Sequence, residues 1–293
     1  GHGNQASIDA NRRLRDSAFK VGFHMMPGQP GMTKEMCVED FRQLFENSDW
    51  RPDYLKIYPT LVVRDTITYD MWRRDEYEPL TNEDAIEVVS EVMGMIPKYT
   101  RLQRVQRDIP ADFIDAGVWK SNLRQLAEQR AEEKGIQLRD IRSREVGMNE
   151  EDPDPENIEL DVMTYESGGG LEQFISFEDT EKDLLVGFCR LRFPSYSHAA
   201  PGPVQEGDTV RRELQDAALV RELHVYGSEA GIGTADGDWQ HKGYGKQLLR
   251  KAEDLAADAG FDKISVISGI GVRQYYREKL GYHQDGPYVS KRL

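Results

Sequence analysis

The feature that most constrains the fold is a glycine-containing turn placed directly before a strongly patterned helix. The turn, Gln240–Gly245, reads QHKGYG. Six apolar residues then recur at helical spacing: Leu248, Leu249, Ala252, Leu255, Ala256 and Ala259. Glycines let the backbone approach a ligand closely, and a helix start presents unpaired N–H groups at the positive end of its dipole. The segment therefore predicts a turn that can hold a pyrophosphate group, with Lys246 adding positive charge at its edge.

The C-terminal half predicts a sheet around this turn and helix. The expected strands are Ile158–Tyr165, Leu171–Glu178, Asp183–Phe193, Leu219–Tyr226 and Lys263–Ser268. A short helix is expected over Val272–Leu280. The run Asn149–Asn157 (NEEDPDPEN) is acidic, contains two prolines and lacks a large apolar residue. It is therefore the best candidate for a domain boundary.

The N-terminal half alternates between strand and helix patterns. Expected strands are Lys20–Met26, Tyr54–Tyr58 and Thr100–Arg107. One helix is expected around Phe41, and another after the capping-box sequence Thr81–Asp84. Strands that alternate with helices indicate parallel βα units. Three such units are too few to close an eight-stranded barrel, so we expect part of a barrel or an open α/β sheet.

Charge is distributed unevenly along the chain. The net charge is −14, which on average repels nucleic acid and suits a high-salt cytoplasm. The stretch Ile96–Gly147 reverses this sign, because it holds 11 Lys and Arg against 8 Asp and Glu. Much of it, Ala111–Gly147, reads as a helical, Arg-rich connector. Such a stretch is either a solvated face or a contact surface for nucleic acid.

Several classes of protein are excluded by composition. No uninterrupted apolar run of about 18 residues exists, so no membrane-spanning helix is expected. The chain begins Gly1-His2-Gly3 without a charged and then apolar leader, so we expect no signal peptide and a truncated fragment of a longer chain. Cys37 and Cys189 lie too far apart in sequence for a CxxC pair. We expect both to be buried thiols in a reducing cytoplasm, with no metal site.

The order of turn, helix, strand and a tyrosine-containing helix resembles the GNAT acetyltransferase superfamily. In that superfamily a Q/R-x-x-G-x-G/A loop binds the pyrophosphate of coenzyme A, which implies acetyl-CoA as substrate here. The residues assigned to the coenzyme are Gln240, His241, Lys242, Gly243, Tyr244, Gly245 and Lys246, with Leu223 and Val225 of the preceding strand. The resemblance also implies a tyrosine near the thioester sulfur as proton donor. Because the segment before Gly281 has one extra residue, Tyr276 is the first choice and Tyr275 the second.

The general base is less constrained by the pattern. Alternation along a strand places Glu222, His224 and Tyr226 on one face, and Arg221, Leu223 and Val225 on the other. Either Glu222 or His224 could deprotonate an amine or activate a water molecule. The alternative is that these polar residues only face solvent or the connector.

Six further segments resemble one family along nearly the whole chain, the catalytic subunit of Elongator with its archaeal and bacterial relatives. They are FKVGFHMMPGQPG (Phe19–Gly31), RPDYLKIYPTLVVR (Arg51–Arg64), RVQRDIP (Arg104–Pro110), RDIRSREVG (Arg139–Gly147), RELHVYGS (Arg221–Ser228) and GPYVSKRL (Gly286–Leu293). The resemblance implies part of a radical-SAM barrel over residues 1–95, a basic connector over 96–150 and a GNAT domain over 151–293. It also implies a cytoplasmic enzyme that carboxymethylates C5 of the wobble uridine, position 34, of tRNA. Elongator-type subunits or a second copy of the chain are further expected partners.

One departure from this family is large. Its barrel begins with a cysteine cluster that holds a four-iron four-sulfur centre and works with S-adenosylmethionine, and Cys37 and Cys189 do not form that cluster. We therefore expect this chain to retain acetyl-CoA binding or hydrolysis and tRNA binding without radical chemistry. Arginine suits phosphate recognition because its planar fork donates two hydrogen bonds. The candidate tRNA contacts are Arg104, Arg107, Arg124, Arg139, Arg142 and Arg144.

Two other functions stay open on the sequence. One is a GNAT N-acetyltransferase that acts on a protein lysine or a small amine, which would need an amine-binding groove near Glu222. The other is a tRNA-binding or partner-binding module that keeps acetyl-CoA as a structural ligand.

Overall fold

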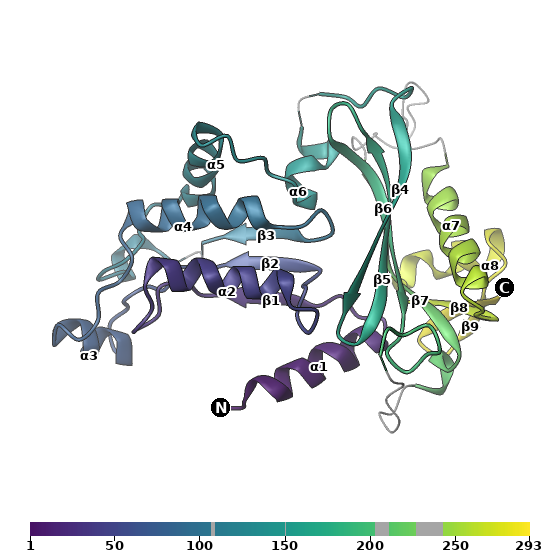
Figure 1. Ribbon diagram of the computed structural model, residues 1–293, viewed down its shortest axis with the longest axis horizontal. Coiled ribbons are helices and arrows are strands. Elements are labelled where there is room, and N and C mark those ends of the chain that lie inside the picture. Colours follow the sequence, from purple (N-terminus) through teal and green to yellow (C-terminus); the bar gives the residue numbers. More distant parts are fainter. Residues whose placement is uncertain (107–108, 150, 203–210, 227–242) are drawn as a thin grey trace. The chain divides into compact units, whose positions relative to one another are not determined.

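The computed structural model describes residues 1–106, 109–149, 151–202, 211–226 and 243–293, and it divides into two compact units (Figure 1). The seven-stranded unit comprises Gly1–Val21, Ser48–Trp50 and Arg144–Leu293. The three-stranded unit comprises Gly22–Asn47 and Arg51–Ser143.

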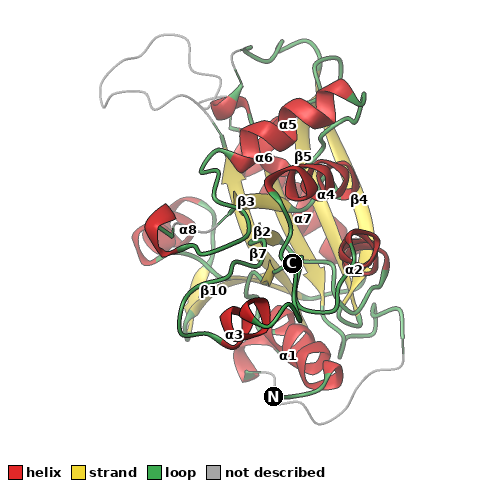
Figure 2. Ribbon diagram, turned by 90° about the vertical axis from the view of Figure 1, so that its left-hand side faces the viewer, coloured by secondary structure: helices red, strands yellow, loops and turns green. Residues whose placement is uncertain are grey.

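The three-stranded unit is built on parallel strands in the order β1-β2-β3, as the alternating pattern predicts. The strands are β1 (Gly22–Met25), β2 (Tyr54–Ile57) and β3 (Arg101–Val105). The helices are α2 (Lys34–Glu46), α3 (Ile67–Arg73), α4 (Asn82–Met95), α5 (Leu123–Glu133) and α6 (Ile141–Arg144), with the 3₁₀ turn η1 (Ala111–Phe113). Helix α4 starts at the expected capping box, since the Thr81 side chain accepts from the Asp84 N–H and Asp84 accepts from the Thr81 N–H. Helix α4 packs against α2 and α5 (Figure 2).

The seven-stranded unit holds one sheet in the order β4-β5-β6-β7-β8-β10-β9, in which only β7 and β8 pair in parallel. Its strands are β4 (Ile158–Ser167), β5 (Gly170–Asp179), β6 (Leu184–Phe193), β7 (Ala217–Val225), β8 (Lys263–Val266), β9 (His283–Asp285) and β10 (Tyr288–Arg292). Its helices are α1 (Asn4–Asp16), α7 (Tyr244–Asp258) and α8 (Arg273–Lys279), with the 3₁₀ turns η2 (Val146–Met148), η3 (Arg212–Leu214) and η5 (Ile270–Val272).

The two faces of this sheet are covered differently. Helices α7 and α8 lie on one face (Figure 1). There the apolar side of α7 packs with Cys189, Leu191 and Val220 into one core. Helix α1 covers part of the other face, where the sheet carries buried arginines and carboxylates instead. The acetyl-CoA chemistry expected near α7 and the polar residues under α1 therefore belong to opposite faces.

The expected α/β class, with parallel βα units followed by a second sheet, is confirmed, and the chain passes from one compact unit to the other between Ser143 and Arg144. The basic connector forms no unit of its own, because it joins the three-stranded unit up to Ser143 and the seven-stranded unit from Arg144. The pattern did not predict α1, whose buried residues are all polar: Asn11, Arg15 and Asp16. This helix belongs to the seven-stranded unit. None of the described helices is long and apolar enough to cross a lipid bilayer.

Candidate functional site

An opening between β7 and β8 is the main feature of the site. The two strands pair from Ala217 opposite Lys263 to Val220 opposite Val266, and the Ile267 N–H donates to the Val220 carbonyl at 3.2 Å. Strand β7 then continues to Val225, and within the described ranges no strand pairs with this edge beyond Val220. The backbone N–H and C=O groups of this edge can therefore pair with an extended ligand.

A β-bulge lies where β7 leaves β8. Val220 is opposite Leu191 and Glu222 is opposite Arg190, so Arg221 is the extra residue. A bulge bends its strand and increases the local twist, and bulges are over-represented next to active sites. The bulge therefore accounts for the separation of β7 from β8.

The start of α7 lies beside the end of β7. Gly243 precedes the helix with φ 77° and ψ 19°, a left-handed conformation that favours glycine. The N–H groups of Lys246 and Gln247 donate to the Gly243 carbonyl at 3.0 and 3.1 Å, whereas those of Tyr244 and Gly245 have no partner within the helix. An added Cβ on Gly245 would lie 3.6 Å from Val225 Cγ2. The N-terminal end of α7 and the open edge of β7 thus adjoin.

Of the remaining residues assigned to the coenzyme, three lie in the ranges that the structure describes and three lie outside them. The Tyr244 ring is buried with its centre 4.8 Å from that of Phe177, which anchors the first turn of α7. Leu223 and Val225 pack against the same apolar core as α7. Gln240, His241 and Lys242 lie outside the described residues, so their assignment stays a prediction.

The two candidate tyrosines differ in burial. Tyr276 is 6% exposed and Tyr275 is 45% exposed. Burial, followed by the nearby Cys189 and Tyr275, raises the pKa of Tyr276. Cys189 is opposite Leu223 in the sheet, so Tyr276 lies on the face toward which Leu223 projects. A phenol with a raised pKa stays protonated at neutral pH and can donate a proton to a leaving thiolate.

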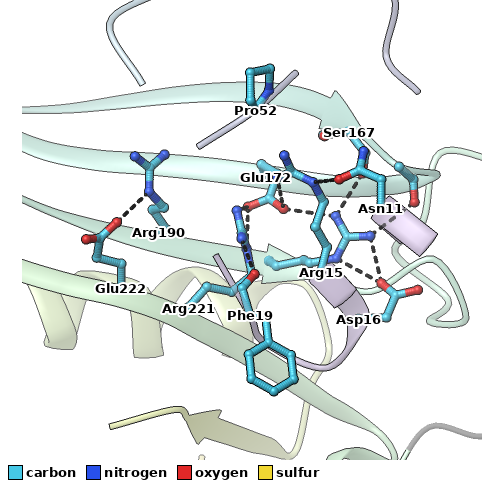
Figure 3. A network of polar contacts seen from close by, with 12 residues as sticks. Asn11, Arg15, Asp16, Phe19, Pro52, Ser167, Glu172, Arg190, Arg221 and Glu222 are labelled. Carbon is cyan, nitrogen blue, oxygen red and sulfur yellow. Dashed lines mark hydrogen bonds and ion pairs between the residues drawn. The ribbon is translucent and has the colours of Figure 1, made fainter. Parts of the chain in front are cut away.

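The two candidate bases project toward the other face. The Glu222 carboxylate accepts from Arg190 Nε and from Lys20 Nζ, each at 2.9 Å (Figure 3). Burial acts to raise the pKa of Glu222, but the charges of Arg190 and Lys20 outweigh it and lower that pKa. His224 is exposed, with its ring centre 4.4 Å from that of Tyr226. Glu222 and His224 are therefore not brought together with Tyr276, and an ion-paired carboxylate with a lowered pKa is a weak base.

Sequence reasoning missed a buried polar network on this second face (Figure 3). Glu172 accepts from Arg192 at 2.9 Å and from two nitrogens of Arg221 at 2.9 and 3.1 Å. Asp16 of α1 also accepts from Arg192, at 2.7 Å. The available signal was the alternation of arginines in the otherwise apolar segment LLVGFCRLRF, since charges at every second position of a buried strand need partners on one face.

The basic residues of the connector fall into two groups. Arg104 and Arg139 are exposed and Arg142 is half-buried, while Arg107 lies outside the described residues. Arg124 donates to the Leu102 carbonyl at 2.6 Å, and burial together with the charge of Arg142 lowers its pKa. Asp140 accepts from the Leu102 N–H of β3 at 3.0 Å, which brings its neighbours Arg139 and Arg142 to the strand that holds Arg104.

Arg144 differs from the other connector arginines. It is 2% exposed and pairs with Glu178 and, at 2.8 Å, with Asp183 of the seven-stranded unit. A buried guanidinium that is already paired with two carboxylates has no free face for a phosphate. Its interpretation as a tRNA contact therefore does not fit the structure.

The cysteines do not fit an iron–sulfur cluster. Cys37 and Cys189 are both buried and belong to different units, and the Cys37 sulfur accepts from the Gly28 N–H at 3.1 Å. Among the described residues no group of three or more His, Cys, Asp or Glu side chains is arranged to hold a metal ion. Since such a cluster needs several cysteine thiolates, this chain does not supply its ligands.

Two family models match the chain. The Radical_SAM C-terminal domain matches residues 52–133, and the Acetyltransferase (GNAT) family matches residues 136–282. These ranges correspond to most of the three-stranded unit and most of the seven-stranded unit.

Individual relatives match over the full chain. A protein named tRNA uridine(34) acetyltransferase from Methanocaldococcus infernus is 45% identical, with 100% of this chain and 54% of the relative covered. Elongator complex protein 3 of Saccharomyces cerevisiae is 42% identical, with 100% and 52% covered. The solved structure of the archaeal M. infernus Elp3 with an N-terminal deletion matches with a TM-score of 0.88 and 44% identity, covering 100% of this chain and 68% of that chain. The chain spans about half the length of the curated relatives it matches.

Proposed function

Because this chain belongs to the Elongator complex protein 3 family and carries a GNAT acetyltransferase domain, we propose that it binds acetyl-CoA and tRNA and cleaves the acetyl thioester. The product chemistry it serves is carboxymethyl-type modification at C5 of wobble uridine 34. The observation that carries the proposal is the junction of three features: the open edge of β7, the anion-binding start of α7 and the buried phenol of Tyr276.

In this proposal acetyl-CoA binds along β7 with its pyrophosphate over the first turn of α7. The Tyr244 and Gly245 N–H groups donate to the pyrophosphate, and the positive end of the helix dipole favours its charge. The pantetheine amides pair with the backbone edge beyond Val220. Water attacks the acetyl carbonyl, the carbon–sulfur bond breaks, and Tyr276 donates its proton to the departing coenzyme A thiolate. As acetate forms, the attacking water loses its two protons to solvent, and one proton returns from solvent to the Tyr276 phenolate. No side chain is assigned as the base, since Glu222 and His224 lie on the other face.

The tRNA-binding part of the proposal rests on the three-stranded unit. Arg104, Arg139 and Arg142, with Arg124 beside them, gather around β3 in a chain whose overall charge is −14. Arg107 adjoins the same strand in sequence. Arg144 is omitted because it is buried and paired. Since the two cysteines do not supply the ligands of an iron–sulfur cluster, radical chemistry on the uridine is not proposed for this chain.

Release of free coenzyme A from acetyl-CoA, measured with and without tRNA, tests the proposal. Release that tRNA stimulates, and that Tyr276→Phe slows about 10²-fold, supports it. Release that depends on an added lysine peptide or small amine instead favours an N-acetyltransferase. Acetyl-CoA binding without turnover under either condition would leave only a binding module and would overturn the catalytic part.

A further inference from the structure

A second buried tyrosine lies against the proposed acid, and the proposed function assigns it no role. Tyr282 follows α8, is 4% exposed and belongs to the same apolar core as Tyr276. The centres of the two rings lie 5.4 Å apart, and the planes of the rings meet at 79°. This is an edge-to-face arrangement, one of the geometries that aromatic pairs prefer. The Tyr276 ring therefore packs directly against the Tyr282 ring.

The chain reversal after α8 brings the two tyrosines together. Gly281 has φ 76°, a left-handed conformation that lets the chain turn back at the end of the helix. As a result, the N–H groups of Leu280 and Tyr282 both donate to the Tyr276 carbonyl at 3.2 Å. The backbone of Tyr282 is thus tied to that of Tyr276, and the contact between their rings does not depend on side-chain packing alone.

Two other elements hold the Tyr282 ring. Its hydroxyl donates to Glu253 of α7 at 2.9 Å, and Lys291 of β10 donates to the other oxygen of that carboxylate at 2.8 Å. The Lys291 ammonium also lies 5.6 Å from the centre of the Tyr282 ring, within the range of a cation–π contact. Burial, followed by the charge of Glu253, raises the pKa of Tyr282, so its hydroxyl stays protonated and keeps donating to the carboxylate at neutral pH. The Tyr282 ring is therefore fixed to both α7 and β10.

The proposed acid has no such anchor of its own. In the part of the chain that the structure describes, the Tyr276 hydroxyl makes no hydrogen bond, which leaves it available to a substrate atom. The orientation of its ring must then come from packing. This matters for the rate, because a displacement of about 1 Å at a reacting group can cost about 10²-fold. A neighbouring ring that is itself held in place supplies the required support.

We propose that Tyr282 is a positioning residue for the Tyr276 acid, and that Glu253 and Lys291 act through Tyr282. The inference rests on the proposed thioester cleavage and adds a requirement to it: the acid donates efficiently only while its ring is held against Tyr282. Tyr282 transfers no proton of its own, so the bonds formed and broken are those of the proposed function. The competing interpretation is that Tyr282 only fills the core, in which case its loss would lower stability without a specific effect on the chemical step.

Steady-state release of coenzyme A in the presence of tRNA tests the inference. Tyr282→Leu removes the ring and should lower kcat about tenfold, while KM for acetyl-CoA changes by less than about twofold. Tyr282→Phe keeps the ring and should restore kcat to within about threefold of the wild type. In a Tyr276→Phe background, Tyr282→Leu should change kcat by less than about twofold, because residues that act as a unit are not additive.

Two further variants separate positioning from packing. Phe261→Leu is the matched control, since Phe261 is buried in the same core but packs on Phe193, at 5.0 Å between ring centres. It should lower Tm and leave kcat unchanged. Glu253→Ala removes the partner of the Tyr282 hydroxyl without opening the core, because the Glu253 side chain is 17% exposed. It should lower kcat about threefold, and it tests the same support if Tyr282→Leu does not fold.

Each contrary outcome has a separate meaning. Wild-type kcat in Tyr282→Leu, or in Glu253→Ala if the first variant does not fold, would overturn the positioning role and leave Tyr276 as the acid. An equal loss of kcat in the wild-type and Tyr276→Phe backgrounds would also overturn it, because Tyr282 would then act independently of Tyr276. A similar loss in Phe261→Leu would mean that any cavity in this core slows release, and the specific role would be wrong. Absence of coenzyme A release by the wild-type chain would overturn the proposed function, and the inference with it.

Discussion

Replacing Glu172 by glutamine should strongly destabilise the seven-stranded unit. Glu172 is 0% exposed and is the shared carboxylate of Arg192, Arg221 and, at 3.5 Å, Arg15. Glutamine keeps the volume of the side chain but removes its charge. Asp16 would still pair with Arg192 (Figure 3), whereas Arg221 and Arg15 would each face a neutral amide in place of the Glu172 carboxylate.

The magnitude follows from the burial of these groups. Breaking a buried ion pair by removing one partner costs about 3–5 kcal/mol, because the other charge stays buried and uncompensated. For a unit of this size each kcal/mol lowers Tm by about 2–4 °C. The melting transition of the seven-stranded unit should therefore fall by about 6–20 °C in scanning calorimetry. The bulge residue Arg221 would lose its ion pair with Glu172 and keep at most hydrogen bonds to a neutral amide oxygen, so the bulge should loosen as well.

A matched control separates charge from burial. Glu159 lies exposed in β4, and Glu159→Gln should change the free energy of unfolding by no more than about 0.5 kcal/mol. The reasoning fails if Glu172→Gln melts within about 2 °C of the wild type. That result would mean that the backbone carbonyls of Ser167, Gly168 and Phe19, which already accept from Arg192 and Arg221, compensate the guanidinium groups without the carboxylate.

Four other changes give measurable outcomes. Gly243→Glu should abolish acetyl-CoA binding in calorimetry. A side chain is strained at this left-handed position, and the new negative charge repels the pyrophosphate. Unchanged affinity in a folded variant would mean that the pyrophosphate does not bind at the start of α7. Tyr276→Phe should slow coenzyme A release about 10²-fold with little change in acetyl-CoA affinity; a defect in Tyr275→Phe instead would move the acid by one residue. The lowered pKa of Glu222 means that its ion pairs stabilise the fold fully above about pH 4.5 and that this stabilisation is lost as the pH falls through the folded-state pKa; the Tm advantage of the wild type over Glu222→Gln should therefore stay constant at neutral pH and shrink progressively once the pH is lowered below about 4.5, and a difference that does not shrink on acidification would contradict it. Reversing Arg139 and Arg142 to Glu should weaken tRNA binding at least about tenfold and reduce the slope of log affinity against log salt by about 0.7–0.9 per lost contact; an unchanged slope with a lowered Tm would mean that these arginines only stabilise the fold.

Local sequence pattern was sufficient to predict the elements that are proposed to bind acetyl-CoA. The apolar stripe after Gly245 predicted α7, and the glycines predicted a turn before it, in which the structure shows Gly243 to be left-handed. By contrast, α1 has no apolar stripe, because its buried residues bind the sheet through hydrogen bonds and ion pairs. The periodicity of apolar residues predicts only helices that bury an apolar face. A helix that packs through polar contacts is therefore not predicted by it. The pairing of Glu172 with Arg192 and Arg221 is not predicted by this periodicity for the same reason.

The connector illustrates a second limit of sequence reasoning. A net charge summed over Ile96–Gly147 counts every arginine equally. In the structure, however, Arg139 is exposed and Arg144, five residues later, is buried. The difference arises where the chain passes from one unit to the other, since Arg144 is the first residue of this stretch to belong to the seven-stranded unit. There it compensates Glu178 on β5 and Asp183 just before β6. A charge reversal at Arg144 would therefore lower the stability of the fold. If Arg144 were included in the tRNA-binding variants, a loss of binding caused by unfolding would be mistaken for a loss of tRNA contacts. Restricting the reversals to Arg139 and Arg142 makes the salt dependence of tRNA binding a measure of the three-stranded unit alone.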